Sequence, residues 1–305
     1  MKKWITILVI LIVVGTSAGG IIAANQLYFK EDDSGEEPVK AEMDDKVTVE
    51  YTGWLQDERI YGDDWRVFDT SYKNVTGKKI ATFREGGRGE PYTFTLGEGV
   101  IEGWNKRIKG MEEGDRKTFK VPPSEGYGSA SDKLFFEVDK TESVPVYETI
   151  NKTTFNDRYD VDPSGRVTVK DQFWGWTKTV ISVEGDMVVL KNEPKLGKMY
   201  EAYSSGDSGW TSEVVSIDTN ANDGDGLIKI RNHAETGVVV DGEHIGQHLP
   251  RFKNVSQIKN NIGQNPEPKG IVVETDDKIK IDFNEEVMGK TLRFNVHIIS
   301  IEESD

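Results

Sequence analysis

The sequence predicts an α+β fold in which a curved antiparallel β-sheet wraps on a short α-helix and is interrupted by a large, mostly β insert domain. Two observations predict the sheet: apolar and polar residues alternate early in the chain, and they alternate again near its end. Such alternation indicates strands, because the side chains of a strand point alternately to its two faces. A third observation predicts the insert, because the intervening region is richer in Asn, Asp, Gly and Ser and has short β-like runs. The first residues add an N-terminal transmembrane helix.

The apolar periodicity predicts the individual elements of the sheet domain. Val47, Val49 and Tyr51 share one face of the first expected strand, as in a half-buried strand. From Ile101 to Met111 the spacing changes to three and four residues, which is typical of one side of a short helix. The expected strands are 46–52 (KVTVEYT), 92–96 (YTFTL), 116–121 (RKTFKV) and 291–302 (TLRFNVHIISIE). The first and last strands therefore belong to one sheet.

The insert carries an imperfect internal repeat. Residues 176–198, 210–237 and 269–290 each contain a strand, an acidic turn, a second strand, an Asn and, a few residues on, a Gly. We interpret them as a series of β-hairpins; the alternative, that any two hairpins look alike at this level, stays open. The expected segments are a membrane anchor or signal segment at 1–30, an acidic linker at 31–44, the first part of the sheet domain at 45–138, the insert at 139–277 and the final strand at 278–305.

The N-terminal segment decides the expected localisation. About twenty uncharged residues follow Lys2 and Lys3, which suits a membrane-spanning helix better than the shorter apolar core of a cleaved signal. The two lysines favour an N-inside orientation, so we expect a single-pass cell-membrane protein whose main body lies outside the cytoplasm. Small residues at 17–20 and 23–24 leave open the alternative of secretion after signal cleavage.

Composition excludes several kinds of chemistry. None of the 305 residues is cysteine, which excludes disulfides, thiolate catalysis and zinc–cysteine sites. The formal net charge of −15 argues against nucleic acid as a partner, because phosphate binding requires a basic surface. His244 and His248 are four residues apart, but the glycines and the proline around them disfavour a helix, and we expect no metal site there. No cofactor is expected either.

Several motifs, taken together, carry a family resemblance. They are DKVTVEYTGWLQD, VFDTS, PYTFTLGEGVIEGW, KGMEEGDRKTFKVPPSEGYG and, far downstream, GKTLRFNV. In this order they resemble the FKBP-type peptidyl-prolyl cis/trans isomerases, over residues 44–130 and 280–303. The interruption after SEGYG is similar to the SlyD-like branch, in which an insert-in-flap chaperone domain replaces the loop over the active site. The insertion here is far longer than that branch usually carries, which implies an enlarged or duplicated insert.

The chemistry of prolyl isomerisation explains the aromatic residues in these motifs. Amide resonance holds an X–Pro bond planar behind a barrier of roughly 18–20 kcal/mol. Its isomerisation needs no nucleophile, metal or cofactor. It needs a dry cavity that binds the twisted imide better than the planar one, since leaving water weakens the resonance. An aromatic bowl with one or two polar groups suits that task.

The resemblance implies a role for each matching residue. Phe68 packs on the prolyl ring, the Asp69 carboxylate orients the imide or its amide partners, and the Tyr127 hydroxyl donates to the substrate carbonyl. Phe294 closes the pocket wall from the last strand. The remaining expected substrate-binding residues are Tyr51 in the wall, Tyr92 at the rim, Val100 and Ile101 at an aliphatic edge, and Trp104 at the floor. Tyr92 departs from the family, which more often has phenylalanine there.

The same residues also allow a plainer interpretation. Tyr51, Trp104 and Phe294 have the character of ordinary core aromatics, and Asp69 that of a turn residue. The connection YKNVTGKKIATFREGGRGE is longer than the family usually has. It extends the substrate platform, partly covers the pocket, or is simply a solvated loop. Its basic residues include Lys78, Lys79, Arg84 and Arg88.

These observations predict a foldase, a peptidyl-prolyl cis/trans isomerase acting on X–Pro bonds of exported or cell-surface proteins. Apolar residues of the insert are expected to form a chaperone-like surface for clients. The expected partners are unfolded or proline-containing polypeptides, and the membrane through the N-terminal helix. The alternative is a non-catalytic proline-peptide-binding or scaffold protein with the same fold.

Overall fold

The computed structural model describes residues 38–248 and 269–304. The expected anchor or signal segment at 1–30 therefore lies outside the described residues. Among the helices of the described part, none has the length and apolar character needed to cross a membrane.

A five-stranded antiparallel sheet forms the first domain, which we call the core domain. The strand order is β2-β1-β17-β4, and β3 pairs with β1 outside this path. The elements are β1 (Lys46–Gln56), α1 (Glu58–Tyr61), β2 (Trp65–Thr70), β3 (Tyr92–Thr95), α2 (Glu102–Ile108), β4 (Arg116–Val121), the 3₁₀ helix η1 (Pro123–Glu125) and β17 (Leu292–Glu302). The predicted α+β plan of a sheet on a short helix is confirmed.

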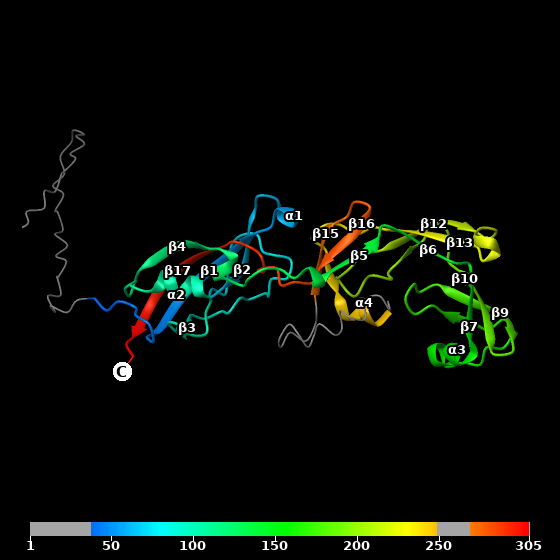
Figure 1. Ribbon diagram of the computed structural model, residues 1–305, viewed down its shortest axis with the longest axis horizontal. Coiled ribbons are helices and arrows are strands. Elements are labelled where there is room, and N and C mark those ends of the chain that lie inside the picture. Colours follow the sequence, from blue (N-terminus) through cyan, green and yellow to red (C-terminus); the bar gives the residue numbers. More distant parts are fainter. Residues whose placement is uncertain (1–37, 249–268, 305) are drawn as a thin grey trace, which may run out of the picture. The chain divides into compact units, whose positions relative to one another are not determined.

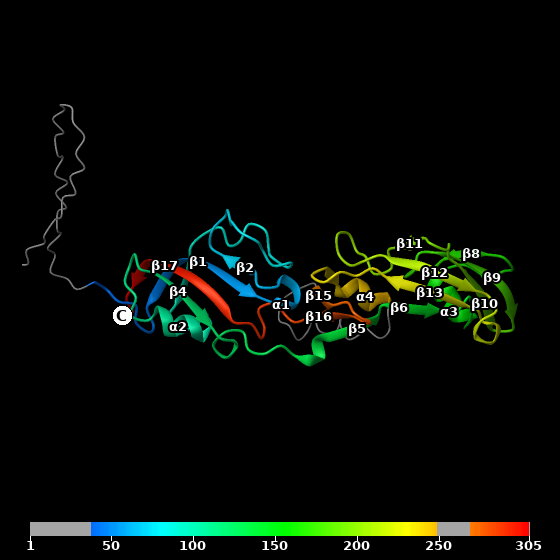
Figure 2. The ribbon, with the colours of Figure 1, turned by 90° about the horizontal axis from the view of Figure 1, so that it is seen from above.

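The last strand lies in the middle of this sheet. β17 pairs with β1 on one side and with β4 on the other, and both views show it between them (Figures 1 and 2). Its alternate residues Leu292, Phe294, Val296 and Ile298 are all buried, as the period-two pattern predicted. Trp104 and other residues of α2 belong to the same hydrophobic cluster. The core domain thus depends on a strand that the chain supplies only after the insert.

The insert consists of three four-stranded antiparallel sheets. Their strand orders are β5-β16-β15-β14, β6-β13-β12-β11 and β7-β10-β9-β8. The strands are β5 (Phe135–Asp139), β6 (Thr141–Val144), β7 (Tyr147–Asn151), β8 (Thr168–Lys170), β9 (Thr177–Glu184), β10 (Met187–Glu193), β11 (Met199–Tyr200), β12 (Ser212–Asp218), β13 (Leu227–Asn232), β14 (Val239–Asp241), β15 (Lys269–Glu274) and β16 (Lys278–Asp282). The helices are η2 (Asp132–Leu134), α3 (Lys152–Tyr159), η3 (Asn222–Gly224) and α4 (Gly242–His248).

The three sheets are nested in the sequence. The chain contributes β5, β6 and β7 in turn, one to each sheet, and then completes the sheets in reverse order with the hairpins β9–β10, β12–β13 and β15–β16. Figures 1 and 2 show each of the three early strands beside its later hairpin. By their order of nesting in the sequence, and not by position in space, we call the sheets with β5, β6 and β7 the outer, middle and inner modules. Hairpins lie at the three places where the repeat was predicted, and each belongs to a complete module.

A buried asparagine closes each module. Asn192, Asn232 and Asn284 are 2%, 1% and 6% exposed and lie within two residues of the end of the last strand of the inner, middle and outer module. Their Nδ2 atoms donate to backbone carbonyl oxygens of the outgoing chain, at Pro145 (3.0 Å), Asp139 (2.9 Å) and Ser131 (3.2 Å) respectively. Each acceptor precedes the strand that opens the same module. The asparagine therefore joins, by a hydrogen bond, the segment that enters a module and the segment that leaves it.

A glycine stands five positions after each of these asparagines. Gly197, Gly237 and Gly289 have φ values of 74°, 87° and 73°, in the left-handed region that glycine adopts without strain. Their N–H groups donate to carbonyl oxygens of Val214, Val272 and Gly128, at 2.8, 2.8 and 2.7 Å. Those acceptors lie in the middle module, the outer module and the core domain. The same pair of residues, an Asn and a Gly five positions later, thus recurs in each module, and the glycine attaches the inner module to the middle one, the middle to the outer one and the outer to the core domain.

The expected domain boundaries need correction at both ends of the insert. The boundary at 138/139 cuts β5, and the boundary at 277/278 separates β16 from the rest of the insert, although β5 and β16 pair with Phe136 opposite Ile281. The insert therefore lies between Ser131 and Asn284. The sequence did not reveal this because an apolar strand looks alike in either sheet. The expected linker 31–44 also ends earlier, since Ala41 is fully buried and its N–H donates to the Met111 carbonyl oxygen at 2.8 Å.

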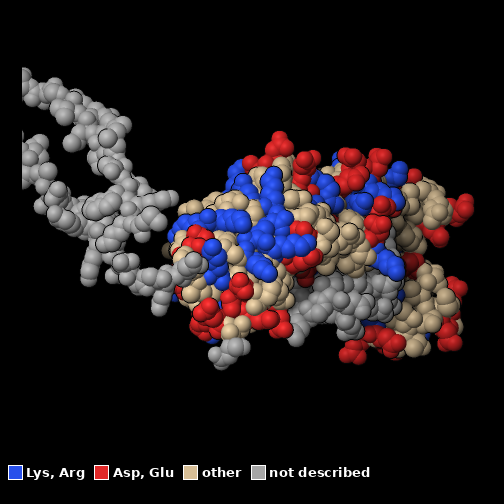
Figure 3. Space-filling view, turned by 60° about the vertical axis from the view of Figure 1, so that its left-hand side comes forward, with Lys and Arg blue, Asp and Glu red and all other residues tan. Residues whose placement is uncertain are grey.

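Charge is distributed unevenly over the surface. Lys and Arg side chains gather on one face of the molecule (Figure 3). On the outer side of the core sheet, the Arg293 guanidinium lies 4.9 Å from the centroid of the Trp54 ring and 4.6 Å from that of Trp65. Lys120 Nζ lies 5.6 Å from the Trp65 ring centroid. These cation–π contacts are local features that a net charge of −15 does not reveal.

Candidate active site

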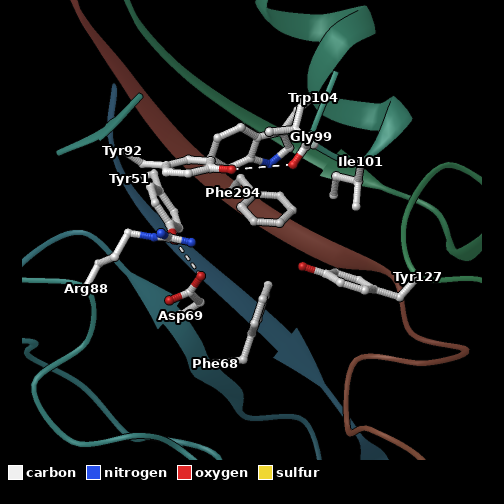
Figure 4. Close-up of a pocket in the computed structure, with 11 residues that line it drawn as sticks. Tyr51, Phe68, Asp69, Arg88, Tyr92, Gly99, Ile101, Trp104, Tyr127 and Phe294 are labelled. Atoms are coloured by element: carbon white, nitrogen blue, oxygen red, sulfur yellow. Dashed lines mark hydrogen bonds between the residues drawn. The ribbon is translucent and has the colours of Figure 1, made fainter. Parts of the chain in front are cut away.

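The core domain holds a cavity of about 360 Å³ (Figure 4). Its lining contains every site residue expected from the sequence, drawn from β1, β2, β3, β17, the start of α2 and the segment after η1. The lining residues are Tyr51, Phe68, Asp69, Arg88, Tyr92, Gly99, Val100, Ile101, Trp104, Tyr127 and Phe294. Arg88 and Gly99 are the two that the sequence analysis did not assign.

Aromatic rings form the floor of the cavity. The Trp104 indole on α2 packs edge-on against Tyr51, with ring centroids 5.0 Å apart, and against Phe294 at 5.3 Å. Trp104 is 4% exposed, and its Nε1 has no hydrogen-bond partner among the described residues. A buried, unpartnered N–H favours an acceptor from a ligand, because leaving it unpaired costs free energy.

The wall of the cavity requires a glycine. The Phe68 ring packs edge-on against the Phe294 ring with centroids 5.6 Å apart. A Cβ atom on Gly53 would lie 2.8 Å from Phe68 Cζ and 2.9 Å from Phe294 Cε1, too close for either ring to remain in place. The glycine of the motif VEYTG therefore allows the two phenylalanine rings to close over β1.

A short chain of polar groups borders the aromatic surface. The Tyr51 hydroxyl donates to Asp69 Oδ2 at 2.5 Å, and Asp69 Oδ1 accepts the Thr70 N–H at 2.8 Å. Arg88 Nε donates to the Tyr51 oxygen at 3.3 Å. Burial and then the hydrogen bond to Asp69 raise the pKa of Tyr51 above its ordinary value of 10. Tyr51 therefore remains a hydrogen-bond donor throughout the neutral range, and Asp69 stays engaged with it.

The open side of the cavity carries the remaining residues. Tyr127 is 41% exposed, and its hydroxyl points toward the cavity (Figure 4). Partial burial, followed by the nearby Asp69 charge, raises its pKa, so it too is a donor at neutral pH. The Tyr92 hydroxyl donates to the Gly99 carbonyl oxygen at 3.4 Å, which uses the group that distinguishes it from phenylalanine. Ile101 is the N-cap residue of α2, next to helix N–H groups that lack partners within the helix.

Arg88 is the residue that sequence reasoning missed. Its guanidinium lies 4.1 Å from the centroid of the Tyr92 ring, besides its contact with Tyr51. It belongs to the long connection between β2 and β3, for which a solvated loop was one interpretation. Most residues of this loop are exposed, but it is not solvated throughout: Ile80 is 8% exposed within the core cluster, and Lys79 pairs with Val67 of β2. The sequence offered one signal for it: Arg88 is the basic residue of this loop that is nearest to Tyr92, a residue already assigned to the site.

Comparison with known proteins agrees with this geometry. Residues 37–141 match the family described as FKBP-type peptidyl-prolyl cis-trans isomerase. FK506-binding protein 1 of Aspergillus oryzae is 33% identical over 103 residues, which are 31% of this chain and 79% of that protein. FK506-binding protein 2 of Dictyostelium discoideum is 34% identical over 131 residues, 42% of this chain and 83% of that protein. A short-type peptidyl-prolyl cis-trans isomerase of Methanocaldococcus jannaschii is 37% identical over 78 residues, 25% of this chain and 49% of that protein.

A curved sheet on one helix, with an aromatic cavity between them, defines a prolyl-binding fold when it carries these motifs. The chain belongs to the FKBP-type peptidyl-prolyl cis-trans isomerase family. It is an enzyme that interconverts the cis and trans forms of X–Pro bonds. The family match ends at residue 141, so it does not extend over the middle and inner modules.

Proposed function

We propose that this isomerase is a membrane-anchored foldase for exported or cell-surface proteins, and that its insert holds unfolded clients near the catalytic cavity. The observation that carries the catalytic part is the cavity itself, in which aromatic rings surround one short chain of polar groups. The insert and the anchor are separate parts of the proposal, and each has its own test below.

In the cavity, the prolyl ring lies between Phe68, Phe294 and the Trp104 floor. The rings exclude water from the imide, which weakens the resonance that keeps the imide planar. The Tyr127 hydroxyl donates to a substrate carbonyl oxygen, and the backbone beside Val100 and Ile101 binds the extended peptide. No covalent intermediate forms, because rotation about one C–N bond is the whole reaction.

Asp69 acts by orienting rather than by proton transfer. Its two carboxylate oxygens already accept hydrogen bonds from Tyr51 and from the Thr70 N–H. The carboxylate and the Arg88 guanidinium thus form a fixed dipole at the edge of the bowl, and that dipole favours the charge distribution of the twisted imide. Replacing Asp69 by Leu should lower kcat/KM on a tetrapeptide about tenfold or more, with circular dichroism unchanged. Wild-type kcat/KM in a folded variant would remove Asp69 from the mechanism.

Exposed apolar residues support a client-holding role for the insert. Ile181 (49% exposed) and Met187 (44%) lie on the β9–β10 hairpin of the inner module. Leu196 (66%), Met199 (43%) and Ile217 (37%) lie on or beside the middle module. Exposed apolar groups gain free energy when an unfolded chain covers them.

The insert can be tested by replacing it. Ser131 and Asn284 are hydrogen-bonded to each other, so a short glycine-rich loop can join them without disturbing the core domain. Activity on a tetrapeptide should largely survive, whereas catalysis of the proline-limited refolding of a protein should fall steeply. In the full chain, Ile181→Ser with Met187→Ser should weaken only the catalysis of refolding. Glu184→Gln on the same hairpin should change neither the refolding activity nor the tetrapeptide activity. Equal loss in both assays would mean that the insert only supports the fold.

The anchor requires a test in cells, since residues 1–30 lie outside the described part of the chain. Protein expressed in its native host should sediment with membranes, and protease added from outside should digest it. A soluble product beginning near residue 25, with no membrane-bound form, would contradict the anchor and favour secretion.

A further inference from the structure

A carboxylate on the chain returning from the insert binds the long loop beside the active site. Glu286 follows the Asn284 junction by two residues. Its Oε1 accepts the Thr82 N–H at 2.9 Å and the Thr82 hydroxyl at 2.6 Å, and its Oε2 accepts the Tyr61 hydroxyl at 2.7 Å. The Tyr61 oxygen in turn accepts the Ala81 N–H at 2.7 Å. One side chain thus joins the return segment, α1 and the loop.

The same loop carries Arg88 to the cavity. After Thr82, the Phe83 ring packs against the core cluster, and the Arg88 N–H donates to the Thr70 carbonyl oxygen at 2.9 Å. Gly87 allows this approach, because a Cβ there would lie 2.9 Å from the same Thr70 oxygen. The loop is therefore held by Val67 of β2 at Ile80, by Glu286 at Thr82 and by Thr70 of β2 at Arg88. Between Thr82 and Arg88 lies a short segment with no regular secondary structure.

We propose that Glu286 is a positioning residue of the isomerase: by holding Thr82 it fixes the loop that places the Arg88 guanidinium against Tyr51 and Tyr92. Glu286 is absent from the cavity lining, so it acts through Arg88 and not on substrate. Because it lies next to the Asn284 junction, it also connects the base of the insert to the polar edge of the active site. The long connection between β2 and β3 thereby gains a function.

Hydrogen bonds to a charged acceptor are the stronger kind, which is why one carboxylate suffices to hold the loop. Glu286 and Tyr61 are half-buried, so water competes only in part for the hydrogen bond between them, whereas Thr82 is exposed. Loss of the carboxylate leaves the Thr82 N–H and two hydroxyl groups without this acceptor. The loop then adopts other conformations, and Arg88 occupies its present position for a smaller fraction of the time.

The test is a double-mutant cycle on the full chain, measured as kcat/KM for a proline tetrapeptide. Glu286→Ala should lower kcat/KM about tenfold in the wild-type background and less than about twofold in an Arg88→Gln background, because both substitutions remove the same arrangement. Thr82→Val should lower it about threefold, and Thr82→Ser, which keeps the hydroxyl, should restore it. Glu85→Gln is the matched control, since Glu85 is an exposed carboxylate of the same loop that pairs only with Lys79 in the described structure, and it should leave kcat/KM unchanged.

Thermal unfolding of each variant separates positioning from loss of fold. A role in stability alone would lower Tm while kcat/KM per folded molecule stayed at the wild-type level, and that result overturns the proposal. Losses that multiply in the Glu286→Ala, Arg88→Gln double variant also overturn it, since the two residues would then act independently. If Glu286→Ala does not fold, the Thr82→Val and Thr82→Ser pair in both backgrounds decides the question in the same way.

Discussion

The Phe294 ring packs edge-on against the Phe68 ring, with centroids 5.6 Å apart, although the whole insert separates them in the sequence. One half of this contact comes from β2 and the other from the strand that the chain adds last. The aromatic cavity is therefore complete only when β17, which follows the insert in the sequence, has paired between β1 and β4.

Phe294→Ala should cause a large fall in kcat/KM on peptides. The truncation opens a void beside Phe68 and Trp104 and admits water, which restores the planarity preference of the imide. It should also cost about 3–5 kcal/mol of stability, so the folded fraction must be measured by circular dichroism. Phe155→Ala is the control, because Phe155 is equally buried in the inner module and should lose stability without losing peptide activity. A folded Phe294→Ala enzyme with wild-type kcat/KM would show that the cavity is not the active site.

Tyr127→Phe should have a small effect. It removes one hydrogen bond to the substrate, worth roughly 0.5–1.5 kcal/mol, so kcat/KM should fall by about one power of ten at most. The residue is 41% exposed, and Tm and circular dichroism should stay unchanged. Unaltered kinetics with several peptides would mean that the hydroxyl does not contact the substrate.

Stability should depend on Tyr51 in alkaline solution. Its pKa is raised in the folded protein, first by burial and then by Asp69, so the folded state keeps a proton that the unfolded state loses above about pH 10. The stability that this group contributes is fully present below pH 10 and is lost as pH rises toward the folded pKa. Urea unfolding between pH 9 and 11 should therefore show a steeper decline for the wild type than for Tyr51→Phe. Identical slopes would mean that the hydroxyl titrates alike in both states.

The junction asparagines should stabilise the insert and not the catalytic domain. Asn232 is 1% exposed; it donates to the Asp139 carbonyl oxygen and to Glu142, and it accepts from the Ser212 hydroxyl. Asn232→Ala removes these three hydrogen bonds and should cost about 1–3 kcal/mol, measured by hydrogen exchange of the middle module. Peptide kcat/KM should not change. Asn220→Ala, at an exposed position, should affect neither, and an equal effect of the two substitutions would deny Asn232 its role.

Local patterns in the sequence determined the elements of the core domain. The alternation in 46–52 and 291–302 and the helical spacing from Ile101 predicted strands and helix close to where they lie, because burying one face imposes a period on the sequence. The site residues came from motif resemblance, and the structure brings them together around one cavity. Their individual roles remain predictions, which the variants above test.

Pairing between distant segments was decided only by the tertiary structure. The sequence showed that 176–198, 210–237 and 269–290 are similar, but not that each hairpin completes a sheet opened by β7, β6 or β5. An apolar strand such as β5 carries no mark of its partner, so the boundary of the insert was misplaced. Arg88 and Glu286 went unassigned for the same reason: their roles depend on contacts between a loop and the segments beside it, and a contact of that kind leaves no period in the sequence. The sequence by itself thus determined which segments are strands and which residues suit a prolyl pocket, whereas long-range hydrogen bonding and packing decided how the modules nest and what holds the pocket in place.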